Sequence, residues 1–157
     1  MPEGDTLHKL AAVLEAELTG QEAVRVHLRD RGELPSLRGE RVVHCEAIGK
    51  HLLVHFANER TLRIHLGLRG SMHKYPHGLG KRAPDFTIIA AIDTASHSYA
   101  CVRGAQAELM RTKDMARHPK LSKLGPDLVK ETVDESLCAR ARASGDRPLV
   151  DVLLDQR

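Results

Sequence analysis

The sequence predicts an α+β fold in which an antiparallel β-sandwich is flanked by helices. Three observations lead to this class. Leucines recur at helical spacing near the N-terminus, short apolar or alternating runs separated by turn residues follow from residue 24 to residue 110, and helical patterns return after residue 112. Many short strands with turns between them are typical of an antiparallel sandwich. The length of 157 residues corresponds to one domain, or to one domain and part of another.

An amphipathic helix of about 16 residues is predicted at the N-terminus. Pro2 suits the first helical turn, where its missing N–H would have no partner, and the acidic side chains of Glu3 and Asp5 favour the positive end of the helix dipole. The apolar stripe of this helix consists of Leu7, Leu10, Ala11, Leu14 and Leu18. Gly20 ends the pattern, and the stripe is expected to face the core.

Strands are predicted from alternation and from apolar runs. They span residues 24–28, 41–48, 51–56, 61–66, 86–92, 99–102 and 108–110. Gly49 and Lys50 form a tight turn between the second and third of these strands. The run 86–92 is almost continuously apolar, which predicts a buried strand. Gly67 and Gly70 bracket a connection from which side chains can project.

Helical signals return near the C-terminus. Thr132 and Glu135 have the spacing of a capping box, and the helix that they open is predicted to run to about Ser144 and to stop at Gly145. Pro148 begins a further apolar helix that the end of the chain interrupts, so a truncated domain is expected there.

The composition excludes several classes of protein. With 41% apolar and 29% charged residues, the chain is similar to ordinary soluble proteins, and it has no apolar run of the roughly 18 residues needed to cross a membrane. The N-terminal residues lack the features of a signal peptide. Three widely separated cysteines, Cys45, Cys101 and Cys138, predict neither a disulfide framework nor a CxxC zinc module, and they favour a reducing, cytoplasmic compartment.

Positive charge is concentrated in the middle of the chain. Residues 24–82 contain twelve Lys and Arg and five acids, for a net charge of +7, whereas residues 1–23 contain one Lys and five acids, for −4. A surface that neutralises phosphates and releases their counterions requires such a basic segment. A solvated basic face without a partner gives the same pattern.

The basic segment also holds seven of the ten histidines. His51, His55, His65 and His73 lie on predicted strands or close to them. Their spacing forms no recognisable ligand pattern with a nearby carboxylate, so no metal site is predicted.

Pro2 is the most informative residue for chemistry. Removal of Met1, which is usual before a small residue, leaves Pro2 as a secondary α-amine. Such an amine has a pKa of roughly 8, so a useful fraction is neutral near pH 7 and can attack a carbonyl carbon to form a Schiff base. Glu3 stands beside it and can move protons. The tripeptide Met-Pro-Glu is also a common way to begin a helix. Motifs elsewhere in the chain are therefore needed to choose between a catalytic and a structural role for Pro2.

Five motifs follow one another along the chain. They are Met-Pro-Glu-Gly-Asp-Thr-Leu-His at 1–8, Ile-Gly-Lys-His-Leu-Leu at 48–53, Arg-Ile-His-Leu-Gly-Leu-Arg-Gly at 63–70, Leu-Gly-Pro-Asp-Leu at 124–128 and Leu-Leu-Asp-Gln at 153–156. Together they resemble the formamidopyrimidine-DNA glycosylase and endonuclease VIII family, and the first two are closer to its endonuclease VIII branch. The Arg-Arg-Phe-Gly pattern of the formamidopyrimidine branch is missing, so a strict preference for 8-oxoguanine is not expected.

The resemblance implies a bifunctional DNA glycosylase and AP lyase that acts on damaged double-stranded DNA. Oxidised bases, with pyrimidines favoured, would be excised, and the strand would be cleaved by β,δ-elimination. Pro2 would attack C1′ of the damaged nucleoside, Glu3 would act as acid and base, and Lys50 would hold a phosphate next to the lesion. The implied DNA-binding residues are Lys50, His65, Leu68, Arg69 and Arg103. Leu68 would be an apolar wedge that offsets the cost of extruding a nucleotide; the alternative is a core leucine.

The resemblance also implies a division into domains. Residues 1–114 would form the catalytic domain, and residues 115–157 an incomplete helix–two-turn–helix DNA-binding domain. Full-length relatives continue into a zinc finger that these residues lack, so no cofactor is expected within this chain. A monomeric bacterial protein of the cytoplasm, without membrane contact, is expected.

Two other functions are compatible with parts of the sequence. A non-catalytic DNA-binding fragment of the same fold would engage phosphates without cleaving the strand. A tautomerase-like enzyme would use Pro2 on a small carbonyl compound and would not bind DNA. The +7 charge of residues 24–82 argues against the tautomerase.

Overall fold

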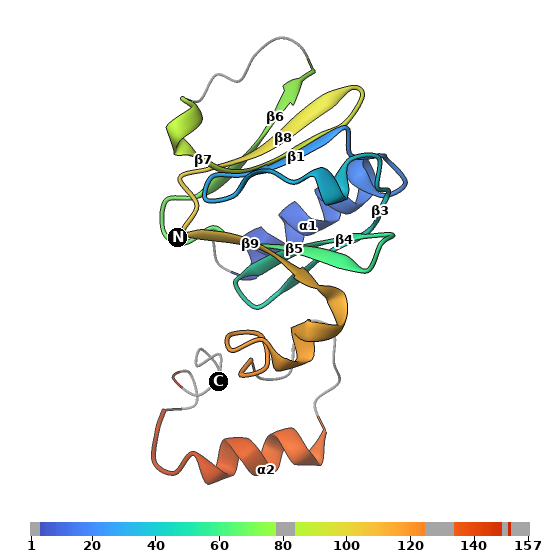
Figure 1. Ribbon diagram of the computed structural model, residues 1–157. Coiled ribbons are helices and arrows are strands. Elements are labelled where there is room, and N and C mark those ends of the chain that lie inside the picture. Colours follow the sequence, from blue (N-terminus) through green and yellow to red (C-terminus); the bar gives the residue numbers. More distant parts are fainter. Residues whose placement is uncertain (1–3, 78–83, 125–133, 149–150, 152–157) are drawn as a thin grey trace. The chain divides into compact units, whose positions relative to one another are not determined.

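The computed structural model describes residues 4–77, 84–124, 134–148 and 151. The chain divides into two compact units, Met1–Asp114 and Met115–Arg157. The first unit combines helix α1 (Gly4–Leu18) with two antiparallel sheets that form separate layers (Figure 1). The predicted α+β class and the antiparallel sandwich are therefore confirmed.

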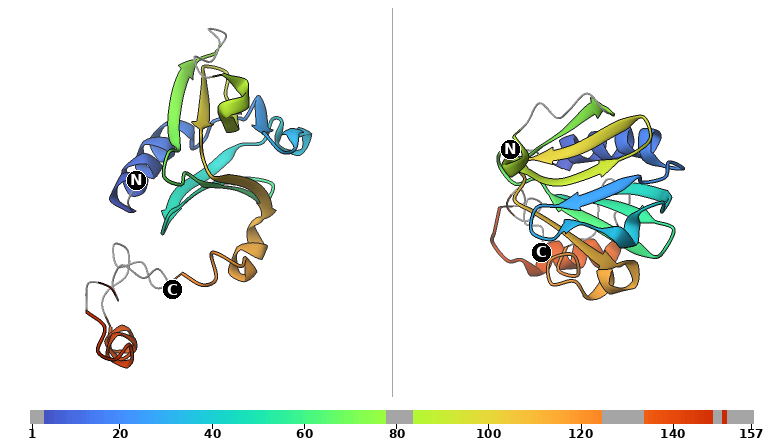
Figure 2. Two further views of the ribbon diagram at one scale, coloured as in Figure 1. Left: turned by 90° about the vertical axis from the view of Figure 1, so that its left-hand side faces the viewer. Right: turned by 45° about the horizontal axis from the view of Figure 1, so that its top comes forward.

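The two sheets have different strand orders. The first sheet is β2-β1-β7-β8-β6 and the second is β3-β4-β5-β9. The strands of the first sheet are β1 (Arg25–Leu28), β2 (Gly32–Glu33), β6 (Ser71–Pro76), β7 (Ile88–Asp93) and β8 (His97–Val102). Those of the second are β3 (Val42–Ile48), β4 (His51–Phe56), β5 (Arg60–His65) and β9 (Gln106–Arg111). Figure 2 shows the two layers from the side.

The apolar stripe of α1 faces the core, as the helical spacing predicts. Leu7, Ala11, Leu14 and Leu18 are buried, and Leu10 packs against the same cluster. Their partners come from the inward faces of both sheets, for example Val54 of β4 and Ile92 of β7. With only two Phe, two Tyr and no Trp in the chain, the core consists mainly of aliphatic side chains.

Glu15 fastens α1 to the second sheet. Its Oε2 accepts a hydrogen bond from the backbone N–H of Cys45 on β3 at 2.5 Å and from the Thr19 hydroxyl at 2.8 Å. Burial by itself raises the pKa of Glu15, but the bonds from Cys45, Thr19 and His44 outweigh it, so that the pKa lies below its usual value. The carboxylate is therefore ionised at neutral pH and keeps the helix aligned with β3.

Strand β6 is absent from the sequence prediction. Its residues 71–76 pair with β8 along their whole length, from Ser71 opposite Val102 to Pro76 opposite His97. The strand lies at the edge of the first sheet and is largely exposed, so it lacks the apolar alternation from which strands are recognised. A basic side chain and a terminal proline are features of protected edge strands.

The predicted buried strand 86–92 starts too early. Residues Asp85–Thr87 form a 3-10 turn instead, in which the Thr87 N–H and hydroxyl both donate to the Pro84 carbonyl. Phe86 on this turn is 78% exposed, so its expected burial is wrong. The proline fixes the turn, and the buried strand β7 begins only at Ile88.

The second unit contains helix α2 (Glu135–Ala143). Gly145, with φ of 68°, ends the helical segment, as predicted. Thr132 and the motifs 125–128 and 153–156 lie outside the described residues, and so does most of the helix expected after Pro148. Two further 3-10 turns, Pro35–Leu37 and Thr112–Arg117, were not predicted. Within the described segments, no helix is long and apolar enough to cross a membrane.

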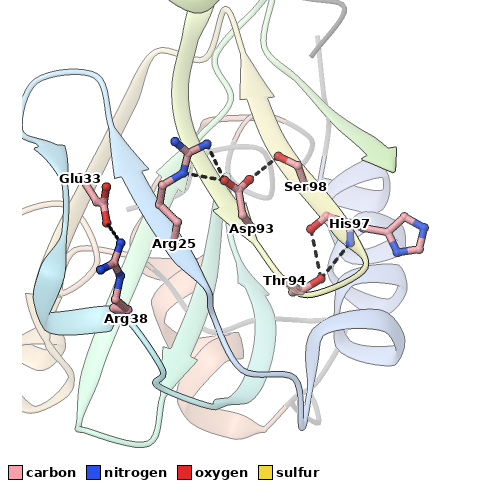
Figure 3. Close-up of polar contacts among 7 residues, drawn as sticks. All are labelled: Arg25, Glu33, Arg38, Asp93, Thr94, His97 and Ser98. Atoms are coloured by element: carbon pink, nitrogen blue, oxygen red, sulfur yellow. Dashed lines mark hydrogen bonds and ion pairs between the residues drawn. The ribbon is translucent and has the colours of Figure 1, made fainter. Parts of the chain in front are cut away.

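A buried carboxylate connects three strands of the first sheet (Figure 3). Asp93 of β7, with a side chain 5% exposed, accepts bonds from Arg25 of β1 through Nε at 2.8 Å and Nη2 at 2.7 Å. The Ser98 hydroxyl of β8 donates to the other oxygen at 2.5 Å. Asp93 is therefore a structural residue whose charge is compensated on both sides.

Replacing Asp93 by Asn should destabilise the first unit. The amide keeps the shape of the side chain but loses two charge-assisted bonds from Arg25, which we expect to cost about 2 kcal/mol in the free energy of unfolding. The exposed pair of Arg38 and Glu33, at 2.9 Å, provides the control, since Glu33→Gln should change stability by less than about 0.5 kcal/mol. Urea unfolding of both variants measures the difference, and equal effects would contradict this role for Asp93.

Candidate nucleic-acid interface

Lys50 occupies the turn between β3 and β4. Ile48 pairs with His51 across this turn, and Gly49 adopts φ of 55°, a left-handed conformation that glycine accommodates without strain. The tight turn expected at Gly49-Lys50 is thus confirmed. The turn holds Lys50 at the end of the second sheet, partly exposed to solvent.

His65 lies at the same end of the sheet as Lys50. The register places His51 opposite His65 and His65 opposite Gln106, so that β4, β5 and β9 are level at this point. The His51 and His65 rings are 5.0 Å apart between centroids, and His51 is buried. His65 and Lys50 are therefore brought together by the strand pairing.

Helix α1 begins at this same end. It runs antiparallel to β3, because Glu15 bonds to Cys45 and the Gly20 N–H that follows the helix bonds to Val42. From Glu15 back to Gly4 the helix rises by roughly 16 Å, and from Cys45 to Lys50 the strand advances by roughly the same distance. The first helical residue is therefore level with Lys50. Pro2 and Glu3 lie outside the described residues, and their roles remain predictions.

Two connections between the sheets lie side by side next to His65. A Cβ added to Gly67 would be 2.8 Å from the Cβ of Ala105, and one added to Gly70 would be 2.9 Å from the Cα of Gly104. The Ala105 N–H also donates to the His65 carbonyl at 2.9 Å. Larger residues at either glycine would push the two connections apart.

Leu68 and Arg69 project from the first of these connections. Leu68 is 73% exposed, so it does not belong to the core, and Arg69 is exposed as well. An exposed leucine on a loop held by two close glycine contacts is a suitable position for an apolar wedge. The wedge function itself remains a prediction.

Arg103 projects from the second connection. Its φ is 54°, a conformation unusual for a residue with a side chain, and its N–H is fixed to the Thr87 carbonyl at 2.7 Å. The side chain is exposed. Local strain of this kind persists only where the surroundings hold the backbone, and here it directs a cation outward beside residues 67–70.

All five predicted DNA-binding residues thus gather at one end of the sandwich. Within the described segments, the side chains of Lys50, Arg69 and Arg103 make no ion pair or hydrogen bond, whereas Arg25, Arg38 and Lys74 are each paired with a carboxylate. Cations without acidic partners are free to neutralise phosphates, which is the main source of affinity for DNA.

Other potentially reactive side chains among the described residues are buried or hydrogen-bonded within the fold. Burial raises the pKa of Cys45 and of Cys101 to about 12, so both thiols are neutral and poor nucleophiles. His55 bonds to Thr61 at 2.9 Å and to Glu46 at 3.2 Å. No cluster of three or more metal-binding side chains occurs in this part of the chain.

One buried charge was not anticipated from the sequence. Arg63 is completely buried on β5 and forms an ion pair with Glu108, its register partner on β9. Arg63 had no predicted role beyond its place in the motif 63–70. A basic residue in an alternating strand normally faces solvent, so burial of Arg63 was not expected.

Comparison with known proteins identifies the family. Residues 1–121 match the model of the formamidopyrimidine-DNA glycosylase N-terminal domain. The chain belongs to the formamidopyrimidine-DNA glycosylase family. The resemblance seen in the five motifs is thereby confirmed.

Curated members of the family are similar over almost the whole chain. Endonuclease 8 of Escherichia coli O139:H28 is 31% identical over 171 residues, and Endonuclease 8 of Klebsiella pneumoniae is 29% identical over 162 residues. In both cases the match covers 99% of this chain and 61% of the relative. This chain therefore spans about three fifths of the length of these glycosylase-family relatives.

Solved structures of the family share the fold. The Lactococcus lactis formamidopyrimidine-DNA glycosylase bound non-covalently to DNA with an AP site has a TM-score of 0.79 at 17% identity, covering 98% of this chain and 62% of that one. The same enzyme in complex with DNA containing an oxidised pyrimidine has a TM-score of 0.80 at 18% identity, covering 99% and 61%. At this identity, the similarity concerns the fold.

Proposed function

We propose that this chain carries the catalytic domain of a DNA glycosylase and AP lyase that removes oxidised bases from double-stranded DNA. One observation carries the proposal: in a member of this family, an exposed leucine and three cations that have no partner among the described residues gather at the end of the sandwich where α1 begins. Residues 1–114 would contain the chemistry, and residues 115–157 would contribute part of the grip on DNA.

The reaction would begin at the amine of Pro2. Its nitrogen attacks C1′ of the damaged nucleoside, the glycosidic bond breaks, and the base leaves with the bonding electrons and takes up a proton. Glu3 protonates the ring oxygen, and the sugar opens to an iminium on the proline nitrogen. Loss of a proton from C2′ then expels the 3′ phosphate, and a second elimination expels the 5′ phosphate.

Lys50 would hold a phosphate beside the reacting sugar, as a mobile point charge on a fixed turn. Leu68 would enter the space left by the extruded nucleotide, and Arg69 and Arg103 would contact the opposite strand. Oxidised pyrimidines are the favoured substrates, as implied by the resemblance of the motifs at 1–8 and 48–53 to the endonuclease VIII branch. We further propose a monomer that works in the bacterial cytoplasm without a cofactor in this chain.

The test is covalent trapping on DNA with an abasic site. Borohydride reduces an iminium to a stable amine, so the processed protein should become cross-linked to the abasic strand, and without borohydride the strand should be nicked. The alternative function, a non-catalytic DNA-binding fragment, predicts salt-sensitive binding with neither trapping nor nicking.

Lys50→Ala should weaken DNA binding and lower the slope of log affinity against log salt by about one. The reason is the loss of one phosphate contact with its released counterion. Arg38→Ala is the matched control, because Arg38 precedes β3 and is already paired with Glu33. Fluorescence anisotropy at several salt concentrations measures both slopes, and an unchanged slope for Lys50→Ala would remove it from the interface.

Glu3→Gln should reduce base excision more than cleavage of a preformed abasic site, since the second reaction needs no departure of a base. Parallel assays on duplexes with an oxidised pyrimidine or an abasic site measure the two rates. Equal losses would contradict the division of roles between Pro2 and Glu3.

A further inference from the structure

A pocket opens on the outer face of the first sheet, away from the core. Its volume is about 640 Å³, which is within the range of small-molecule sites. Strand β6 forms one wall, and the turn around Thr87 together with the end of β8 forms another. Lys50, Leu68 and Arg69 of the proposed interface are not among its described lining residues.

Two aromatic rings of β6 stand on this outer face. Met72 packs into the main core, so its neighbours His73 and Tyr75 face the other way. Their rings are nearly parallel, with an interplanar angle of 17° and centroids 6.0 Å apart. Tyr75 also packs on a second apolar cluster that includes Ala100 and Val102. The pocket therefore presents fixed ring faces, on which a planar base can stack.

The charge of the pocket favours a phosphate. None of its described lining residues is acidic. The Lys74 ammonium is bound by Glu17 at 2.8 Å. The Arg103 side chain has no partner among the described residues, whereas its backbone N–H is bound by the Thr87 carbonyl. An unpaired guanidinium and two aromatic rings in the lining of one pocket match the two halves of a nucleotide, its phosphate and its base.

The pocket is continuous with the proposed DNA interface. Arg103 belongs to the connection that lies against Gly70, and Ser71 begins β6 immediately after it. A DNA strand that contacts Leu68 and Arg69 therefore reaches Tyr75 if it continues along β6. In a duplex the base faces are covered by neighbouring bases, so only an unpaired nucleotide can place its base on Tyr75.

We propose that this pocket is a second nucleotide-binding site, which takes one unpaired nucleotide of a DNA strand with its base on Tyr75 and His73 and its phosphate on Arg103. The proposal rests on the proposed function, because it assumes that DNA lies along residues 67–70. It predicts that DNA with a single-stranded extension binds more tightly than a blunt duplex.

Two variants of Tyr75 test the site. Tyr75→Leu keeps an apolar side chain against Val102 but removes the ring, and Tyr75→Phe keeps the ring. We expect Tyr75→Leu to bind fluorescein-labelled single-stranded oligothymidylate about tenfold more weakly, with Tyr75→Phe close to the unmodified protein. Binding and nicking of a blunt abasic duplex should be unchanged in both variants, and thermal unfolding checks that both are folded.

The outcomes separate this proposal from the proposed function. If Tyr75→Leu binds the single strand as tightly as Tyr75→Phe while the duplex is nicked, the pocket proposal is overturned and the proposed function stands. If the unmodified protein binds neither DNA, both fail. If Tyr75→Leu weakens single-strand and duplex binding equally, Tyr75 belongs to the general interface, and a separate site for an unpaired nucleotide is overturned.

Discussion

Adding one residue before Pro2 should abolish covalent trapping on abasic DNA. The addition turns the secondary amine into an amide, whose nitrogen lone pair is delocalised into the carbonyl group and cannot form an iminium. Retention of Met1 has the same effect, so the two forms of one sequence differ only at the nucleophile. Removal of a nucleophile typically lowers turnover by a factor on the order of 10³ or more.

The measurement compares three preparations on the same abasic duplex: the processed protein, the protein extended by one residue and the Lys50→Ala variant. Intact mass first establishes whether Met1 has been removed from each. The processed protein should be trapped by borohydride, the extended protein should not, and both should bind the duplex with similar affinity at low salt. Lys50→Ala is the control for binding, since it should still be trapped when salt is low. Trapping of the extended protein at an undiminished rate would place the nucleophile elsewhere in the chain.

The fold was largely predictable because its elements follow regular patterns. The leucine stripe of α1 and the alternation in β1 each reflect one buried face, and that periodicity is visible in a single sequence. Edge strand β6 was missed because it buries little. Phe86 was misassigned because hydrophobicity alone does not reveal a turn fixed by Pro84.

The candidate site was predictable in its parts but not in its assembly. The motifs indicate Lys50 and Leu68, and the family resemblance implies Arg103, yet nothing in the sequence spacing shows that the connections 67–70 and 103–105 touch. That contact depends on the pairing of β6 with β8 and of β5 with β9, which are long-range events. The same holds for the pocket beside Tyr75, since its walls are about ten to thirty residues apart in the chain.

Glu108→Gln should destabilise the first unit much more than Arg63→Met. The Arg63 side chain is fully buried, and its Nη1 pairs with Glu108, while its Nε and Nη2 have no hydrogen-bond partner in the described part of the chain. Almost the whole compensation of this buried charge therefore comes from one carboxylate. Removing that carboxylate leaves an uncompensated guanidinium inside the protein, which costs about 3 kcal/mol in comparable cases.

Arg63→Met has the opposite consequence. Methionine fills a similar length of space, needs no hydrogen bond, and lies on β5 next to Leu53 of β4, which is also buried. The carboxylate that remains at Glu108 is 33% exposed, so water can solvate it. We expect a change in the free energy of unfolding within about 1 kcal/mol, in either direction.

A double-mutant cycle with urea unfolding measures the coupling between the two side chains. The Arg63→Met/Glu108→Gln protein should recover most of the stability lost in Glu108→Gln, because the buried charge is gone. If Arg63→Met were the more damaging single change, the guanidinium would be stabilised by more than Glu108. Recovery in the double variant would instead show that the carboxylate is present chiefly to neutralise a buried arginine two residues before His65 of the proposed interface.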